Sequence, residues 1–480
     1  MGFLMKLALV NLDRTSDIPP LGLAYLASYL RKYLNFYNIV IVDKEDPIKK
    51  IKKEKPDIVG ISSTTTEFPQ ANNLAREIKA RFDIPLIIGG YHISLLPKHL
   101  SPSNFDIGVI REGEQTMLEL MKTYERYGSF PKNELRKICG IVFRNENKKN
   151  EITKRRKLIE PLDLIPFPAR DLLKREHYLT PRRLSYYGDV GIYTTMHASR
   201  GCPYNCCFCA SSHFWKRPRF NSPEYIVEEI KELIEKFKVD GIEFVDDLFV
   251  TSKRRLEEIV SLFKKEGINE RLKLITISMR ADSINKEICK LLKEMNATMI
   301  GFGLESGSEK ILKYLKNDTV TVKDNRHALR LCKQFGFKTW GTFIIGSPEE
   351  TLKDLKLTLD LVRDKNLDIA DFYRLTPFPG TKVWNYTKKV GKVTDDINFD
   401  FSQLNFITDL SPTKKIGEKE LRNQYFIFQK EVAKKRYLNR KTVINLKYFR
   451  YLFSPGFIKR IIRNWKPTLK HFINSEIKLR

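Results

Sequence analysis

The sequence predicts an α/β protein with two parallel-sheet domains and a basic helical tail. Two series of short apolar runs alternate with helical patterns along the 480 residues, which is the signature of βα units. A charged, Pro-punctuated stretch separates the two series. We therefore expect a first domain over residues 1–140, a linker over 141–187, a second domain over 188–410 and a tail over 411–480.

The apolar runs of the first domain predict a doubly wound, flavodoxin-like sheet, because each run is followed by a helical pattern. The runs lie at residues 6–11, 39–42, 58–61, 86–88 and 107–110. Ligands of such sheets bind beyond the carboxyl ends of the strands. Ser62, Ser63, Gly89 and Gly90 follow two of these runs, either as ligand contacts or simply as turn residues. In the linker, we interpret the charged run at residues 148–157 as a solvated hairpin turn.

The second series predicts a partial parallel (β/α)6 barrel of the TIM type. Its six runs lie at residues 193–197, 241–245, 273–278, 298–303, 338–345 and 370–375. The chemistry of such barrels takes place at the carboxyl-terminal face of the strands. Polar residues directly after these runs are therefore the first candidates for a functional site.

Composition indicates an ordinary globular protein of a reducing compartment. Hydrophobic residues make up 42% of the chain, yet no run reaches the roughly 18 apolar residues of a spanning helix. The first residues do not resemble a cleavable signal, so we expect a cytoplasmic protein. Four of the seven cysteines, Cys202, Cys206, Cys207 and Cys209, crowd into eight residues. No disulfide framework requires such crowding, and a metal site is the better interpretation.

Cys202, Cys206 and Cys209 have the spacing C-x3-C-x2-C in a loop after the first strand of the second series. Three thiolates on one loop can bind three irons of a [4Fe–4S] cluster and leave the fourth iron open to a substrate. A structural zinc site would need a fourth ligand, usually from a second cysteine pair, and the sequence contains no such pair. Cys207 is expected to pack in the interior rather than to bind metal.

The loop Arg200-Gly-Cys-Pro-Tyr-Asn-Cys-Cys-Phe-Cys resembles that of the radical S-adenosylmethionine (SAM) superfamily. In that superfamily the open iron binds SAM, and one electron from the cluster cleaves it to a 5′-deoxyadenosyl radical. The resemblance implies that the backbone of Phe208 contacts the adenine and that Asp246 or Asp247 meets the methionyl amine. It also implies that Arg280 lies near the methionyl carboxylate and that Glu305 contacts SAM. Taken singly, each charged residue would also fit a structural ion pair.

Motifs that begin at Pro19, Gly89 and Asp106 resemble the cobalamin (B12) binding domain of one branch of this superfamily. The residues that the resemblance assigns to cobalamin are Ser62, Ser63, Gly89, Gly90 and His92. For His92, a turn histidine without a ligand fits the sequence equally well. Other B12 proteins supply a histidine to cobalt near the first strand, where this chain has Pro19. We therefore expect no protein imidazole on the lower face of the cobalamin.

The resemblance implies an enzyme with a [4Fe–4S] cluster, SAM and cobalamin that methylates an unactivated carbon, served by an electron donor such as ferredoxin or flavodoxin. Cyclisation or rearrangement without methyl transfer is an open alternative. A tRNA methylthiotransferase would suit the net charge of +28 but has a second cysteine triad, whereas only Cys139 precedes the loop here. A cobalamin-binding sensor with an inert cluster is the non-enzymatic alternative.

The tail is strongly basic, with 19 Lys and Arg against 4 Asp and Glu from Thr413 onward. Phe457, Ile461 and Trp465 recur at helical spacing among these charges. Such a helix either packs on the barrel or lies on an anionic membrane surface, in which case the substrate would be a lipid or an isoprenoid. Nucleic acid is not expected as a partner, because no RNA-binding module is recognisable.

Overall fold

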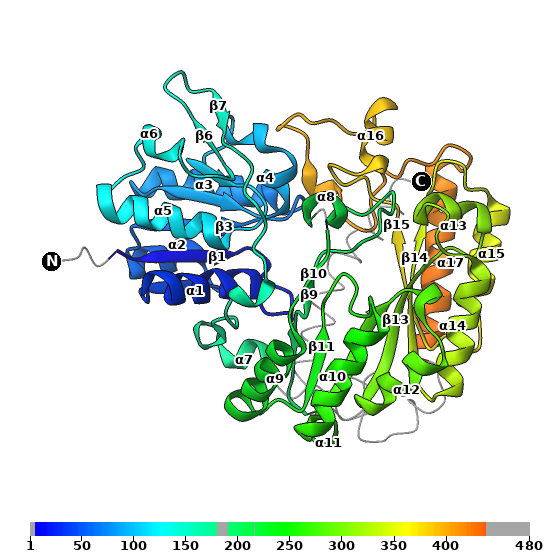
Figure 1. Cartoon of the computed structure of the whole chain (residues 1–480). Helices are drawn as coiled ribbons and strands as arrows, with labels where there is room; N and C mark the ends of the chain where they lie inside the picture. Colours follow the sequence, from blue (N-terminus) through cyan, green and yellow to red (C-terminus); the bar gives the residue numbers. More distant parts are fainter. Residues whose placement is uncertain (1–4, 180–190, 216, 438–480) are drawn as a thin grey trace, which may run out of the picture.

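The computed structural model describes residues 5–179, 191–215 and 217–437. Figure 1 shows two lobes, a first domain in blue and cyan and a second in green and yellow. Each lobe is built on its own sheet, so the predicted fold class is confirmed. No helix among the described residues is long and apolar enough to span a membrane. Most of the predicted tail, residues 438–480, lies outside the described residues.

The first sheet has the strand order β2-β1-β3-β4-β5-β6-β7, of which β1 to β5 are parallel and β6 and β7 antiparallel. The order 2-1-3-4-5 is that of a flavodoxin-like fold. The strands are β1 (Leu7–Asn11), β2 (Ile39–Val42), β3 (Ile58–Ser62), β4 (Leu86–Gly89), β5 (Ile107–Val109), β6 (Ile141–Arg144) and β7 (Asn150–Ile152). The five predicted runs all form strands.

Helices cover both faces of this sheet, which explains why its strands read as continuous apolar runs. On one face α1 and α5 pack over Leu7 and Leu9; on the other α2, α3 and α4 pack over Ala8 and Val10. The helices of this domain are α1 (Leu21–Leu34), α2 (Pro47–Glu54), α3 (Phe68–Arg81), α4 (Tyr91–Leu95), η1 (Pro97–Leu100), α5 (Glu114–Tyr127) and α6 (Lys132–Leu135).

The first sheet continues past the predicted domain boundary at residue 140, because β6 and β7 belong to it. The sequence places both strands in the linker because a charged run begins at the end of β6 and covers β7, the edge strand. A turn joins them, with Lys148 in the left-handed region at φ 58°. The rest of the linker, as far as residue 179, contains only short helical turns: η2 (Leu162–Leu164), η3 (Arg170–Leu172) and α7 (Arg175–Tyr178).

The second sheet has six parallel strands in the order β15-β14-β13-β12-β11-β8, which confirms the predicted partial barrel. They are β8 (Tyr193–Met196), β11 (Gly241–Phe244), β12 (Lys273–Met279), β13 (Ala297–Glu305), β14 (Lys338–Ile345) and β15 (Ile369–Arg374). A small antiparallel pair, β9 (Ser199–Arg200) and β10 (Arg219–Phe220), follows β8.

Helices connect the strands, and local signals define where several of them begin. Ser222 and Ser252 cap α9 and α10, and Thr321 and Thr351 form capping boxes at α14 and α15. The helices are α8 (Ser211–Trp215), α9 (Pro223–Phe237), α10 (Lys253–Lys265), α11 (Ile268–Arg271), η4 (Ala281–Ser283), α12 (Lys286–Glu294), α13 (Glu309–Lys316), α14 (Val322–Gln334), α15 (Leu352–Val362), α16 (Lys382–Lys389), η5 (Phe401–Gln403) and α17 (Glu418–Tyr437).

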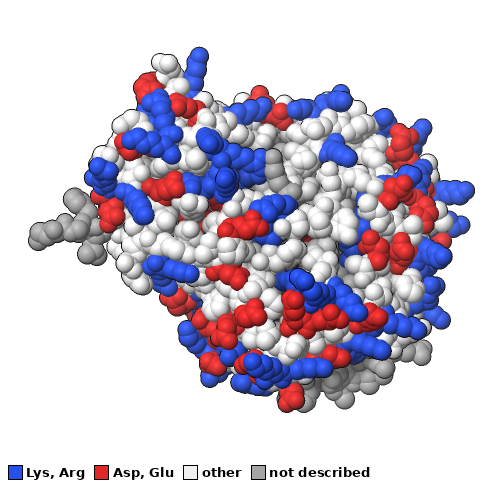
Figure 2. All heavy atoms as spheres, viewed as in Figure 1, with Lys and Arg blue, Asp and Glu red and all other residues white. Residues whose placement is uncertain are grey.

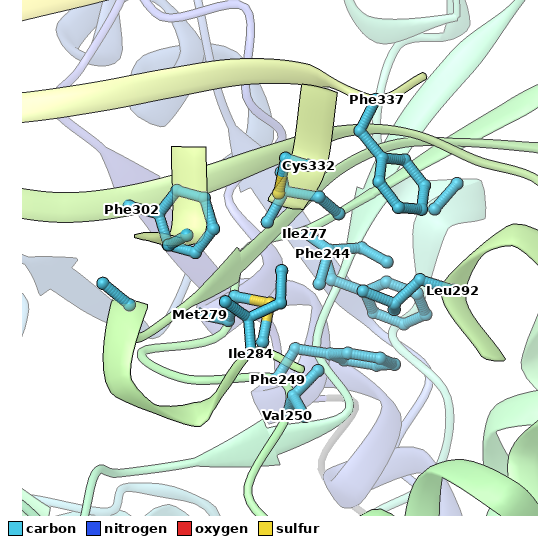
Figure 3. Close-up of a cluster of buried hydrophobic side chains, with 14 of the residues drawn as sticks. Phe244, Phe249, Val250, Ile277, Met279, Ile284, Leu292, Phe302, Cys332 and Phe337 are labelled. Atoms are coloured by element: carbon cyan, nitrogen blue, oxygen red, sulfur yellow. The ribbon is translucent and has the colours of Figure 1, made fainter. Parts of the chain in front are cut away.

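The core of the second domain lies between its sheet and these helices. Figure 3 shows part of it, where Phe244 and Ile277 from the strands meet Leu292 of α12 and Cys332 of α14. Burying one such side chain stabilises the folded protein by about 1.5–3 kcal/mol. Because this core holds one face of the sheet, the carboxyl ends of the strands have fixed positions.

The first part of the predicted tail packs on the barrel as α17. Leu421, Phe428 and Val432 are buried, and the Phe428 ring lies 4.1 Å from that of Phe372 on β15. The helix therefore covers the last strand of the sheet. This result concerns residues 418–437 only, and Phe457, Ile461 and Trp465 lie outside the described residues.

Candidate functional site

The cysteine loop begins at the carboxyl end of β8, and the β9–β10 pair ties its two ends together. Gly201 has φ 91°, and a Cβ there would lie 2.8 Å from the carbonyl oxygen of Arg217. A glycine is therefore required for the loop to turn. Cys202, Cys206 and Cys209 are all half-buried and line one cavity of about 260 Å³.

This cavity brings the predicted cluster and SAM residues together. Besides the three cysteines, the cavity is lined by Phe208, Asp246, Asp247, Arg280 and Glu305. Among the described residues, no three His, Cys, Asp or Glu side chains converge as ligands of one metal ion. Each thiolate of a [4Fe–4S] cluster binds a different iron, so the donor set fits the cluster without such convergence. Burial raises the pKa of the Cys209 thiol to about 11, so iron must displace its proton.

Cys207 faces away from this cavity into a separate apolar cluster. Its neighbours there include Ile311, Leu315 and Val383, and the residue is 3% exposed. Its backbone is held too, because its N–H donates to the carbonyl of Leu315 at 3.0 Å. This position agrees with the expected packing role.

Asp246 and Asp247 have different surroundings. Asp246 is buried and accepts hydrogen bonds from the Ala198 N–H at 3.1 Å and from the Ser199 hydroxyl. Burial raises its pKa to about 6. Asp247 is exposed to the cavity and accepts from the Ser211 hydroxyl at 2.5 Å. Asp246 therefore holds the start of the cysteine loop, and Asp247 is the carboxylate available to a ligand.

Arg280 is held on three sides at the end of β12. Its guanidinium pairs with Asp282 at 2.9 Å and donates to the Thr319 carbonyl at 2.9 Å. It also stacks on the Tyr204 ring, 3.5 Å from the ring centre. Tyr204 belongs to the cysteine loop and lines the cavity, and its role was not predicted from the sequence. The stacking couples the position of the arginine to that of the loop.

Glu305 lies at a β-bulge between β13 and β14 and has φ 57°. The bulge turns its carboxylate toward the Lys316 amine, which lies 3.0 Å away in the interior. A Cβ at Gly303 would overlap both groups. Burial opposes the charge of Lys316, but the Glu305 carboxylate raises the pKa of the lysine overall.

Lys316 lines the cavity and was missed in the sequence. A signal was present, because Lys316 follows the buried Leu312 by four positions and so falls on the apolar stripe of α13. A charged residue in such a stripe indicates a buried partner.

A second cavity of about 260 Å³ lies beyond the carboxyl ends of β1, β3, β4 and β5. Gly60, Ser62, Gly89 and Gly90 line it. Gly90 has φ 98°, and a Cβ there would lie 2.5 Å from the carbonyl oxygen of Ser63. These small residues leave the open edge that a bulky nucleotide tail requires.

Ser63 and His92 do not line this cavity, in contrast to the expectation from the sequence. The Ser63 hydroxyl donates to the carbonyl of Thr64. The His92 ring is fully buried, stacks on Phe68 at 3.7 Å and hydrogen-bonds to His99 at 2.9 Å. The first turn of α4 directs the ring toward α3. His92 therefore follows Gly89 and Gly90 in sequence, but its side chain points into the core between α3 and α4 and not into the cavity.

The second domain closes the other side of this cavity with His197, Arg200, Phe214 and Trp215. Burial, together with the neighbouring arginines, lowers the pKa of His197 to about 4, so its imidazole is neutral at physiological pH. None of these four residues was predicted as a contact. They lie in or beside the cysteine loop, and only the tertiary structure brings them to the first domain.

The short helix α8 contacts both cavities. Its Ser211 donates to Asp247 in the cysteine cavity, and its Phe214 and Trp215 line the cavity of the first domain. Phe214 also packs on Tyr91, with 4.3 Å between ring centres. The two cavities are therefore neighbours separated by one turn of chain.

Comparison with known proteins identifies the family. Residues 196–362 match the model of the radical SAM superfamily, and residues 8–121 match that of the B12 binding domain. An uncharacterized methyltransferase of Pyrococcus horikoshii is 34% identical over 379 residues, which are 77% of this chain and 78% of that protein. The chain belongs to the cobalamin-dependent radical SAM enzymes. It is therefore an enzyme whose family uses a [4Fe–4S] cluster, SAM and cobalamin.

Two further comparisons add to this assignment. The anaerobic magnesium-protoporphyrin IX monomethyl ester cyclase of Rubrivivax gelatinosus is 28% identical over 422 residues, 84% of this chain and 71% of that protein. The structure of the radical SAM methyltransferase TsrM from Kitasatospora setae, with cobalamin and a [4Fe–4S] cluster bound, has a TM-score of 0.64 at 19% identity. It covers 87% of this chain and 81% of that chain, and it supports the fold.

Replacing Cys202, Cys206 or Cys209 with Ala is expected to abolish cluster assembly and SAM cleavage, because each thiolate binds its own iron. Cys207→Ala is the matched control, with a stability cost of about 1 kcal/mol and an intact cluster. Iron and sulfide content and visible absorbance after anaerobic reconstitution measure the outcome. Full cluster occupancy in any of the first three variants would contradict the assignment.

Lys316→Met is expected to destabilise the protein by about 3–5 kcal/mol, because it leaves the Glu305 carboxylate buried without a cation. Lys313→Met in the same helix is the control, since its ion pair with Asp318 is exposed and is expected to contribute less than about 1 kcal/mol. Melting temperatures and SAM affinity of both variants are compared. Equal melting temperatures would show that the buried pair is dispensable.

Proposed function

We propose that the protein transfers a methyl group to an unactivated carbon of a small molecule. One observation carries the proposal: the cysteine cavity and the cavity of the B12 binding domain lie on either side of α8, whose Ser211 donates to Asp247 of the first cavity and whose Phe214 and Trp215 line the second. A substrate at this junction would be within reach of both cofactors. The name of the Pyrococcus horikoshii relative, a methyltransferase, supports the same reaction.

Within the cysteine cavity, we assign the three loop cysteines to the cluster and the surrounding groups to SAM. Asp247 would accept from the methionyl amine, and Arg280 would face the carboxylate. The backbone of Phe208 would contact the adenine, and Glu305, oriented by Lys316, would complete the SAM contacts. Cluster and SAM supply the radical when bound, while these side chains position the substrate carbon and exclude water.

In the other cavity, we assign Ser62, Gly89 and Gly90 to cobalamin, which supplies the methyl group when bound. Ser63 and His92 lie behind Gly89 and Gly90 and hold the backbone there in place. Ser63 does so through backbone contacts, since its N–H donates to the Gly89 carbonyl at 3.0 Å and its carbonyl accepts from the His92 N–H. Burial against Phe68 makes His92 a packing residue in this assignment.

Methyl transfer is favoured over the other reactions that the sequence left open. The cyclase among the relatives shows 28% identity against 34% for the methyltransferase. The retained carboxylates and arginine beside the cysteines do not favour an inert sensor. Reduction of the cluster calls for a small electron-transfer protein such as ferredoxin or flavodoxin, and thus for a reducing compartment such as the cytoplasm. Membrane contact through residues 438–480 stays a prediction.

The reaction class is tested with SAM that carries a deuterated methyl group. The reconstituted enzyme with a reductant is expected to form 5′-deoxyadenosine and, with substrate, S-adenosylhomocysteine and a product that has gained the labelled methyl. Mass spectrometry follows all three. A product of unchanged carbon number would show cyclisation or rearrangement, and the absence of 5′-deoxyadenosine would indicate a sensor.

We expect cobalamin to bind in the base-off form, with neither its own benzimidazole nor a protein imidazole on cobalt. Among the described residues that line its cavity, the first domain contributes no histidine, and His197 reaches it from the barrel side. Electron paramagnetic resonance of the Co(II) form is expected to lack nitrogen superhyperfine splitting. Splitting that disappears in a His197→Ala variant would instead make His197 an axial ligand and contradict the expectation.

A further inference from the structure

A third cavity, of about 240 Å³, adjoins the cobalamin cavity, and Arg111 and Glu112 line both. Its remaining walls are of two kinds. Pro97, Ile110 and Leu158 supply apolar surface. The cationic wall consists of Arg111, Arg155, Arg156 and Lys157. The cavity thus combines apolar and cationic groups at the edge of the proposed active site.

The only carboxylate among the described residues of this cavity, Glu112, is already neutralised. It accepts from Arg200 at 2.8 Å and from Arg219 at 2.9 Å, both outside the cavity. Arg156 is neutralised as well, because its guanidinium pairs with Glu119 of α5. The charges of Glu112 and Arg156 are therefore balanced by ion pairs with residues that do not line the cavity.

Three cations remain without a carboxylate. Neither Arg155 nor Lys157 has an ion pair or a side-chain hydrogen bond to any described residue. The Arg111 guanidinium donates to the backbone carbonyl of His213 at 2.8 Å, which is a neutral acceptor. Arg155 and Lys157 are exposed and Arg111 is half-buried, so water screens part of their mutual repulsion, and an anion between the three charges would lower it further.

We propose that this cavity binds a phosphate or similar anionic group of the substrate, whose carbon skeleton then extends past Arg111 into the methylation site. The inference rests on the proposed function and names a substrate class for it. Guanidinium groups bind phosphate oxygens in bidentate geometry, and a lysine adds a point charge. Arg111 lines both cavities, so an anion held there would direct the attached carbon toward the cobalamin.

A solvated surface run is the alternative explanation for these charges, and the sequence alone favoured it. The structure separates two parts of the run. The turn that joins β6 and β7 is a solvated hairpin as expected, whereas residues 155–157 line the cavity. Figure 2 shows Lys and Arg gathered on this face of the molecule, beside the segment that leads from β7 toward the second domain.

The test uses the enzyme loaded with cluster and cobalamin, and inorganic pyrophosphate as the probe. Calorimetric titration at low salt compares the wild type with Arg155→Ala/Lys157→Ala. Lys149→Ala/Lys154→Ala is the control, because it removes the same charge from the same charged run, at positions outside the cavity wall. We expect the first pair of substitutions to weaken pyrophosphate binding by at least about tenfold, and the control by less than about twofold.

Two results would overturn the inference: no binding to the wild type, or an equal loss in the control. A third measurement identifies the source of the phosphate, since cobalamin itself contains one in its nucleotide loop and cobinamide does not. If the Arg155→Ala/Lys157→Ala protein binds cobalamin and cobinamide as tightly as the wild type does, the result supports an anion of the substrate as the ligand of this cavity. A loss for cobalamin alone would overturn the assignment to the substrate. Formation of 5′-deoxyadenosine by the wild type tests the proposed function separately.

Discussion

A buried charge network at the domain interface holds the site together. Glu112, which follows β5 closely, pairs with Arg200 and Arg219 from the two ends of the cysteine loop. Glu114 completes it by pairing with Arg200 at 2.7 Å. Removing these charges from water costs several kcal/mol for each ion, and the cost is offset only when all partners are in place. Because Arg200 precedes Cys202 by two residues, the network fixes the cysteine loop against the B12 binding domain.

Aromatic side chains surround this network and strengthen it. The Trp215 ring lies 5.6 Å from the guanidinium carbons of both Arg200 and Arg219, and the Tyr25 ring lies 5.2 Å from that of Arg200. These rings exclude water, so the charge pairs act in a medium of low dielectric constant. The separation of the two cavities is thus defined by side chains of the interface.

Two residues with positive φ lie at the cysteine cavity and its loop. Glu305 adopts a left-handed backbone conformation at a bulge, and Gly201 turns the loop with a positive φ. Such conformations cost of order 1–3 kcal/mol for a residue other than glycine, and they persist where the surroundings hold them. Here the Glu305–Lys316 pair and the hydrogen bonds to Asp246 provide that support. The bulge that strains the backbone at Glu305 also directs its carboxylate into the cavity.

Much of this architecture could be read from the chain. The strands of both sheets could be predicted because they are buried on both faces and their apolar runs are continuous. The edge strand β7 could not, since a solvated edge has little apolar signal, and the buried strand β6 was not assigned to the sheet because a charged run follows it directly. At the site, the gathering of Cys202, Cys206 and Cys209 at one cavity could be predicted because their spacing is local and needs no knowledge of the fold.

The sequence by itself therefore determined the fold class, the spacing of the cysteine triad and the strand ends that border the two cavities, because these properties depend on residues close together in the chain. Only the tertiary structure decided how the side chains are used. It buried His92 behind the cavity, brought His197 to it from the other domain, paired Lys316 with Glu305 and placed Arg155 and Lys157 in a cavity wall. Each of these outcomes depends on contacts between segments distant in sequence, and a local pattern contains no information about which face of an element another segment will cover.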